Sequence, residues 1–174
     1  MDDYTRFILA HKLQRDMTTN SLTAVIQDAV DRTRMTEVPV ADRTKLLSDN
    51  GLGYISRAFR DYSKLVEIKR MLAAPYHPQT NGKLERYHQT LKRGVNQVPY
   101  EMPSDLVEAL AAFVNYYNYR RYHKALGTVT PAVVLEGRRE RILQRRREVK
   151  VQTIVRRRLH NRTLREFTQA LPYP

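Results

Sequence analysis

The sequence predicts an α/β domain, because short apolar runs of strand length alternate with segments that have helical periodicity. The apolar runs at 6–13 (RFILAHKL) and 44–48 (TKLLS) are too brief to form helices of their own. Between them, apolar residues from Leu22 to Val30 recur at the i, i+3, i+4 spacing of one helix face. The chain has 174 residues, the size of one ordinary domain, so we expect one core.

The first half of the chain is expected to follow a strand–helix–strand order. Thr19 or Asn20 can cap the first helix, since a side-chain oxygen there accepts a hydrogen bond from a free backbone N–H. The second strand runs into Asp49, Asn50 and Gly51, which are residues typical of turns. Asp49 is therefore expected at the carboxyl end of a strand. The predicted elements are a strand at 6–13, a helix through 22–30, a strand at 44–48, a short helix through 59–66 and a strand at 68–71.

The second half is expected to be helical after one loop. Residues 73–82 (AAPYHPQTNG) hold two prolines, an asparagine and a glycine, and this composition predicts a loop. Helices are expected through 84–95 and from Ser104. A third is expected from Pro131, because proline suits a first helical turn. The segment that follows this helix is basic, and we expect it to form a further helix. We expect a core at 1–137 and a basic tail at 138–174.

Positive charge is concentrated in the last quarter of the sequence. The whole chain has 31 Lys and Arg against 18 Asp and Glu, which gives a net charge of +13. Between Arg138 and Arg165, twelve Lys and Arg residues accompany two acids. Such a segment favours binding to a phosphate backbone, because binding releases condensed counterions. A solvated basic tail on an unrelated protein is the alternative interpretation.

Composition excludes several other classes of protein. The sequence has no cysteine, which rules out disulfides, thiolate zinc sites and cysteine nucleophiles. No apolar run approaches the roughly 20 residues of a membrane-spanning helix, and the acidic start MDDYTRFILA differs from a secretory signal. We therefore expect a cytoplasmic protein without a membrane partner.

Asp49 and Glu85 form a candidate pair of metal ligands. Glu85 lies about one turn into the helix that follows the predicted loop. Sites in open α/β sheets lie at the carboxyl ends of strands, and a helix beside that edge can direct a carboxylate to the same point. Two Mg²⁺ (or Mn²⁺) ions held by carboxylates can catalyse phosphodiester chemistry. In a chain with 18 acids, such a pair also occurs by chance.

The motifs around this pair are SDNG at 48–51, PYHPQTNGKLERYHQTLK at 75–92 and NYYNYRRYHKALGTVTPAVVL at 115–135. Together they resemble the integrase-like transposases of bacterial insertion sequences, which are relatives of retroviral integrases. The resemblance covers essentially the whole chain. It implies a ribonuclease H-like mixed sheet flanked by helices, in a bacterial, nucleoid-associated protein that works as a homo-oligomer. In the family's Asp, Asp, Glu triad, Asp49 and Glu85 match the second and third members.

The resemblance also implies contacts with DNA around the candidate site. Tyr76, Gln79 and Asn81 belong to a segment that, in the family, lies beside the metals and helps to position DNA ends. Gln89 and Lys92 share a helix face with the candidate glutamate, and Lys92 is expected to meet a phosphate. A solvated surface lysine is the alternative. The candidate DNA-binding residues in the tail are Arg138, Arg139, Arg145, Arg146 and Arg147.

The family's first aspartate has no counterpart in this sequence. That aspartate stands on the first strand of the family's sheet, and DDYTRFI at 2–8 resembles the end of the second strand, so the first strand is expected upstream. Asp2 and Asp3 fall at a turn. One hypothesis is therefore a polynucleotidyl transferase core that is inactive alone, and the alternative is a fragment that only binds DNA. A magnesium hydrolase of another class would require neither the motifs nor the basic tail.

Overall fold

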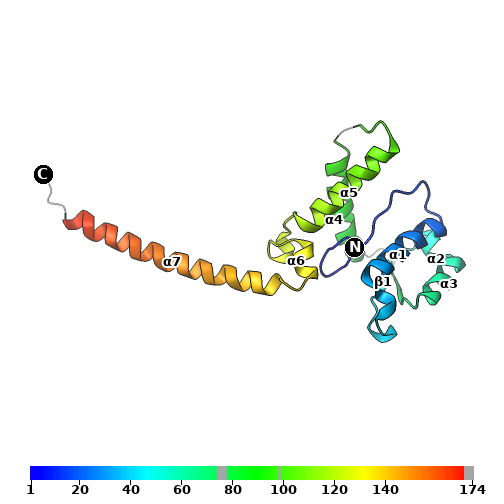
Figure 1. Ribbon diagram of the computed structural model, residues 1–174, viewed down its shortest axis with the longest axis horizontal. Coiled ribbons are helices and arrows are strands. Elements are labelled where there is room, and N and C mark those ends of the chain that lie inside the picture. The colour runs from blue at the N-terminus through cyan, green and yellow to red at the C-terminus, as the bar shows by residue number, and fades with distance from the viewer. Residues whose placement is uncertain (74–77, 98, 171–174) are drawn as a thin grey trace.

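The protein is described by a computed structural model that covers residues 1–73, 78–97 and 99–170. The elements form two groups, and one long helix leads away from them (Figure 1). In chain order they are α1 (Thr19–Thr33), β1 (Leu46–Ser48), α2 (Leu52–Ile55), α3 (Arg57–Leu65), β2 (Arg70–Leu72), α4 (Pro78–Val95), α5 (Pro103–Tyr119), α6 (Pro131–Leu135) and α7 (Arg139–Ala170). Short 3-10 turns lie at Met35–Glu37, Val40–Asp42 and Lys124–Leu126.

The first group is built around the parallel pair β1 and β2, in which Leu46 lies opposite Arg70 and Ser48 opposite Leu72. Parallel strands need a crossover connection, and α2 and α3 provide it. α1 packs against both of these helices. The predicted strands at 44–48 and 68–71, and the helical segment between them, are thereby confirmed.

The strand predicted at 6–13 is wrong, because this segment pairs with no neighbouring strand among the described residues. A turn precedes it, in which Asp2 N donates to Phe7 O at 2.8 Å and Asp2 Oδ1 accepts from Thr5 N at 2.6 Å. Asn118 of α5 takes the place of a partner strand. Its side-chain amide accepts from Ile8 N at 2.9 Å and donates to Ile8 O at 3.1 Å. Asp2 lies at a turn, as expected.

Two other predicted boundaries are also wrong. α1 is capped by Thr18 and not by Thr19 or Asn20, because the Thr18 side chain accepts from Ser21 N. The loop predicted at 73–82 is too long, since α4 already begins at Pro78. Proline lacks an N–H and has a helical φ, so the first turn of a helix tolerates it well.

The second group consists of α4, α5 and α6. α4 and α5 pack against each other and enclose the core of this group. Its buried residues are Ile8, Tyr87, Val114 and Tyr117. The rings of Tyr87 and Tyr117 meet edge to face, with centroids 5.0 Å apart. Ile8 comes from the N-terminal segment, so this segment is part of the α4–α5 core.

α6 opens at Pro131, as predicted. Thr130 caps it, since its side chain accepts from Val133 N. A second cluster of buried residues consists of Leu126 and Val129, which precede α6, and Val134 of α6 itself. The start of the long C-terminal helix packs against this cluster.

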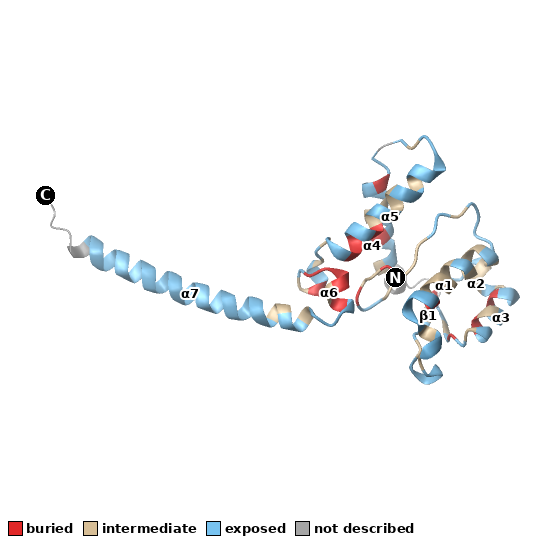
Figure 2. Cartoon of the chain, viewed as in Figure 1, coloured by how far each residue is buried: buried red, intermediate tan, exposed pale blue. Residues whose placement is uncertain are grey.

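α7 confirms the helix expected in the basic tail. Its first turns are attached to the second group, because Ile142 packs against the α6 cluster and Arg146 donates to Gly127 O at 2.9 Å. Beyond these contacts, every residue from 144 to 168 is exposed (Figure 2). Within the described residues, none of the helices combines the length and apolar character that a membrane crossing requires. The division into 1–137 and 138–174 stays a prediction.

Candidate active site

Asp49 follows the last residue of β1, at the edge of the sheet where both parallel strands end. Its side chain is exposed, and one carboxylate oxygen accepts from Gly51 N at 3.0 Å. Asn50 ties this turn to the neighbouring strand, because its Nδ2 donates to the carbonyl oxygen of Ala73, directly after β2, at 3.2 Å. The sequence motif SDNG therefore holds a carboxylate at the carboxyl edge of the sheet, as predicted.

Tyr54 of α2 lies beside Asp49. Burial raises the pKa of Tyr54, and the negative charge of Asp49 raises it further, so the phenol stays protonated. The ring is held edge-on to Phe59, with centroids 5.3 Å apart. Arg70 of β2 donates to Tyr54 O and places its guanidinium 5.0 Å from the Phe59 ring centre. The protonated phenol can thus donate a hydrogen bond near Asp49, and no sequence signal singled out this residue.

Glu85 lies in the second turn of α4 and is exposed. Tyr87, two residues on, is buried against α5, and residues two apart on a helix face in nearly opposite directions. The packing of α4 on α5 therefore turns Glu85 outward. Gln89 and Lys92 are also exposed and follow at i+4 and i+7, so they share the face of Glu85.

Asp49 and Glu85 belong to different packing groups. Asp49 lies in the group of β1, β2 and α1–α3, whereas Glu85 lies on α4, which packs against α5. Among the residues that the structure describes, no group of three or more Asp, Glu, His or Cys side chains could hold a metal ion. The two carboxylates are both available at the surface, and their joint role as ligands stays a prediction.

The other predicted DNA contacts near Glu85 lie at the start of α4 or outside the described part. Gln79 and Asn81 fall in the first turns of α4. Tyr76 lies outside the described residues.

The five predicted arginines of the tail divide into two kinds. Arg139 donates to Leu126 O at 3.0 Å, and Arg146 donates to Gly127 O and Thr128 O, so both attach α7 to the core. The side-chain partners of Arg138, Arg145 and Arg147 lie within or next to α7, at Glu136, Glu148 and Gln144. The second kind remains exposed and available to a polyanion.

The motif at 115–135 has a structural explanation. Asn118 binds the backbone of Ile8 through both atoms of its amide. His123 pairs with Val129 in an isolated antiparallel bridge, and Leu126 is buried in the α6 cluster. These residues maintain the fold behind α4, and no sequence rule had given them a role.

Comparison with known families identifies this scaffold. Two family models, both described as integrase core domain, match residues 1–78 and 66–131. Between them they account for the chain from its first residue to the start of α6. The chain belongs to the integrase core family.

The integrase core is also similar in sequence to retroviral polyproteins. It is 31% identical over 98 residues to the Gag-Pro-Pol polyprotein of squirrel monkey retrovirus, which covers 56% of this chain and 5% of the polyprotein. It is 34% identical over 65 residues to the Pro-Pol polyprotein of simian foamy virus type 1, which covers 37% of this chain and 6% of that protein. The chain thus spans about a twentieth of these relatives. Neither match supports the bacterial, nucleoid-associated setting that the motifs suggest.

Solved structures confirm the predicted integrase fold. The catalytic core domain of BIV integrase matches with a TM-score of 0.57 at 21% identity, over 80% of this chain and 84% of that domain. The HTLV-2 integrase catalytic core domain, in complex with magnesium in a trimeric form, matches with a TM-score of 0.55 at 14% identity, over 75% and 77%. The present integrase core has the same ribonuclease H-like class of fold, with β1 and β2 as the sheet of its described part.

Proposed function

We propose that this integrase core is a polynucleotidyl transferase core that cuts and joins the DNA ends of a mobile element, with Asp49 and Glu85 as metal-binding carboxylates. The position of Asp49 at the carboxyl end of β1 is the observation that supports the proposal most. In α/β sheets this edge is where ligands bind. DNA is then the partner, and a homo-oligomer is the assembled form.

The donor atoms suit a hard divalent ion. Asp49 and Glu85 offer carboxylate oxygens, which Mg²⁺ and Mn²⁺ prefer to softer ligands. Gly51 orients the Asp49 carboxylate and leaves its second oxygen without a hydrogen bond from the described residues. When bound, such an ion supplies Lewis acidity to a phosphodiester.

The remaining roles fall to exposed polar side chains of the chain itself. Lys92 can bind a DNA phosphate and Gln89 can donate an amide hydrogen to the same backbone, since both share the Glu85 face. The exposed arginines of α7 add attraction that is independent of DNA sequence. DNA would therefore lie across the Glu85 face of α4, with α7 as a second contact.

The test uses Asp49→Asn and Glu85→Gln in the full chain, with Glu101→Gln as the matched control. Asn can still accept from Gly51 N, and Glu85 and Glu101 are exposed, so all three variants should keep the fold. Mn²⁺ affinity, followed by electron paramagnetic resonance, should fall more than about tenfold for the first two, since even outer-shell changes cause losses of that size. With the chain completed by a polypeptide that supplies the family's first aspartate, strand transfer and nicking of duplex oligonucleotides should fall by orders of magnitude in these two variants.

The control should match the parent in both assays. If all four proteins bind Mn²⁺ equally and show equal activity, Asp49 and Glu85 are not the site. Duplex binding with neither Mn²⁺ binding nor activity in the parent would leave the DNA-binding-only alternative.

A further inference from the structure

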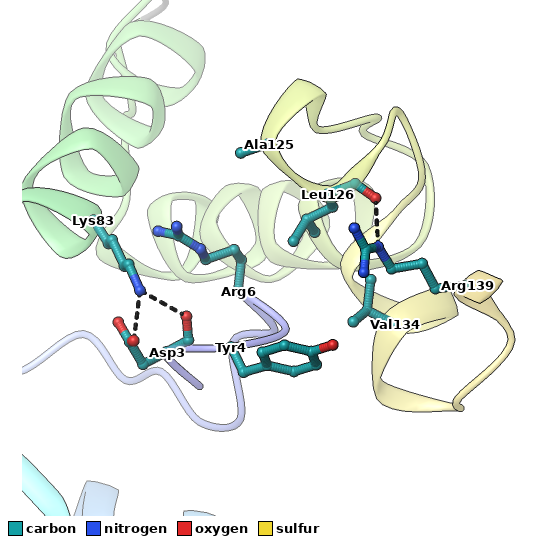
Figure 3. Close-up of a pocket in the computed structure, with 8 residues that line it drawn as sticks. All are labelled: Asp3, Tyr4, Arg6, Lys83, Ala125, Leu126, Val134 and Arg139. Atoms are coloured by element: carbon teal, nitrogen blue, oxygen red, sulfur yellow. Dashed lines mark hydrogen bonds and ion pairs between the residues drawn. The ribbon is translucent and has the colours of Figure 1, made fainter. Parts of the chain in front are cut away.

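A cleft of about 270 Å³ lies on the second group, away from the candidate carboxylates. We call it the Arg6 cleft. Its walls come from the N-terminal turn, the start of α4, the 3-10 turn before α6, α6 itself and the first residue of α7 (Figure 3). The lining residues are Asp3, Tyr4, Arg6, Lys83, Ala125, Leu126, Val134 and Arg139.

Arg6 is unusual in two independent ways. Its φ of 65° lies in the left-handed region, which costs a residue with a Cβ about 1–2 kcal/mol. Its Nε atom is buried and has no hydrogen-bond partner among the described residues. A buried guanidinium nitrogen is unfavourable unless an acceptor reaches it. Backbone strain and an unsatisfied donor at one residue are typical of a position kept for a ligand.

The charges around the cleft favour an anion. Lys83 is paired with Asp3, and Arg139 is paired with Glu140 at 3.0 Å. Arg6 has no ion pair within the described part of the chain, so no carboxylate there neutralises its positive charge. In Figure 3 the Arg6 side chain lies between Lys83 and Leu126.

The neighbouring histidine does not compete for the anion. Burial, and then the positive charges of Arg121 and Arg6, lower the pKa of His123 to about 4. His123 is therefore neutral at pH 7. The positive potential at this site comes from the side chains of Arg6, Lys83 and Arg139.

The cleft lies on another side of α4 from Glu85. Lys83 and Glu85 are two residues apart, so their side chains diverge by about 200° around the helix axis. Arg139 stands at the point where α7 leaves the core. A ligand bound here would touch both the start of α4 and the root of α7 without covering the candidate carboxylate.

We propose that the Arg6 cleft binds one phosphate group of a DNA backbone, with Arg6 as the main donor and Lys83 and Arg139 at its rim. The planar guanidinium suits a phosphate because it can donate two parallel hydrogen bonds. This inference rests on the proposed DNA-binding function. The cleft then anchors DNA between the α4 face and α7, at a position separate from the site of cutting and joining.

The test compares Arg6→Asn with Arg34→Asn in the full chain. Arg34 is a matched control, because it also has a left-handed φ, of 49°, but is exposed and outside the cleft. Asn tolerates this backbone conformation, so both variants should melt at or above the temperature of the parent. Between about 50 and 200 mM salt, Arg6→Asn should lower the slope of log affinity for a duplex against log salt by about 1. Arg34→Asn should leave that slope unchanged.

A second arm uses inorganic phosphate alone, compared with sodium chloride at the same ionic strength. Phosphate should raise the melting temperature of the parent and of Arg34→Asn, but not that of Arg6→Asn. If phosphate stabilises through Arg6 while duplex affinity and salt slope do not change, the cleft holds a free phosphate and the DNA proposal is overturned.

The remaining outcomes are equally decisive. If the parent binds duplex DNA and Arg6→Asn behaves like Arg34→Asn, the inference fails while the proposed function stands. If the parent does not bind duplex DNA, the proposed function fails as well. Should Arg6→Asn lose its fold, Lys83→Gln gives the same slope test from a side chain at the rim of the cleft.

Discussion

The side-chain amide of Asn118 makes the two backbone hydrogen bonds to Ile8 that a neighbouring β-strand would otherwise make. Both atoms of its buried side-chain amide are used by Ile8, whose N–H and C=O would otherwise lack a partner. A buried backbone group without a hydrogen bond costs about 1–3 kcal/mol, so the amide stabilises more than its own two bonds suggest.

Asn118→Ala should therefore lower the free energy of unfolding by about 2–4 kcal/mol, because it leaves two backbone groups of Ile8 unsatisfied. Urea unfolding measures the loss. Asn96→Ala is the control, since Asn96 is exposed just after α4 and should change stability by less than about 0.5 kcal/mol. Equal effects of the two substitutions would show that the Ile8 contact contributes nothing.

His123 should make stability depend on pH. Its ring lies 4.8 Å from that of Tyr117, and its Nε2 is buried without a hydrogen-bond partner among the described residues. Burial, then Arg121 and Arg6, lower its pKa to about 4. The unfolded chain has the ordinary histidine pKa of about 6.5, so between these values it binds more protons than the folded chain. The free energy of unfolding should therefore fall as the pH falls from about 6.5 to about 4.

The expected size of this loss is about 1–2 kcal/mol once partial exposure to solvent is allowed for. Urea unfolding between pH 4 and 7, about the window in which histidine titrates, should show a shallower pH dependence for His123→Gln than for the parent. His160→Gln, on the exposed part of α7, should keep the dependence of the parent. Identical pH profiles for both variants would mean that His123 is not held neutral in the folded chain.

Among the elements, α4 and α5 approach each other so closely at Gly94 that one added carbon atom would clash. A Cβ at Gly94 would lie 2.8 Å from Phe113 Cε2, closer than van der Waals contact allows. Gly82, on the same helix, has open space around it. The two glycines therefore allow the close approach of α4 to α5 to be separated from the intrinsic helix propensity of α4.

Gly94→Ala should destabilise the chain by about 1–3 kcal/mol, because the added methyl group forces α4 and Phe113 apart. Gly82→Ala should stabilise it by up to about 1 kcal/mol, because alanine is the better helix former. Thermal melting distinguishes the two signs. Stabilisation by both substitutions would show that α4 and α5 are farther apart than described.

The part of α7 beyond its attachment to the core should contribute to DNA affinity and not to stability. Residues 149–168 are exposed and follow Arg146, which donates to the backbone of Gly127 and Thr128, so substitutions there remove no packing against the core. Replacing Arg156, Arg157 and Arg158 together with Gln should reduce the salt slope of duplex binding by about 2–3, since each phosphate contact contributes about 0.9. The melting temperature should stay within error of the parent.

The matched control replaces the same three arginines with Lys, which keeps the charge and should keep the slope. Loss of affinity in the Lys variant as well would point to the arginine fork as the source of binding. An unchanged slope in the Gln variant would mean that this part of α7 does not touch the phosphate backbone.

For the whole molecule, the sequence predicts best what local contacts decide. The stripe from Leu22 to Val30 predicts α1, and the turn residues after Ser48 place Asp49 at the end of β1, because each depends on neighbours a few residues away. The motif match adds the fold class, which the integrase core structures confirm.

What the sequence predicts poorly depends on distant partners. Residues 6–13 have the composition of a strand, but a strand requires a neighbour, and here α5 provides one amide in its place. The surroundings of Asp49 are another case, since Tyr54 reaches it only through the packing of α2. The Arg6 cleft combines five segments of the chain, and no spacing rule brings Asp3, Lys83 and Arg139 together.

The hydrogen bonds between Ile8 and Asn118 join positions 110 residues apart. During synthesis the N-terminal segment therefore leaves the ribosome before its partner, Asn118, has been made. At about 5–20 residues per second this takes roughly 5–20 s. Throughout that time the run RFILAHKL has no α5 to cover it, so the nascent chain presents an apolar, unpaired segment that chaperones can recognise.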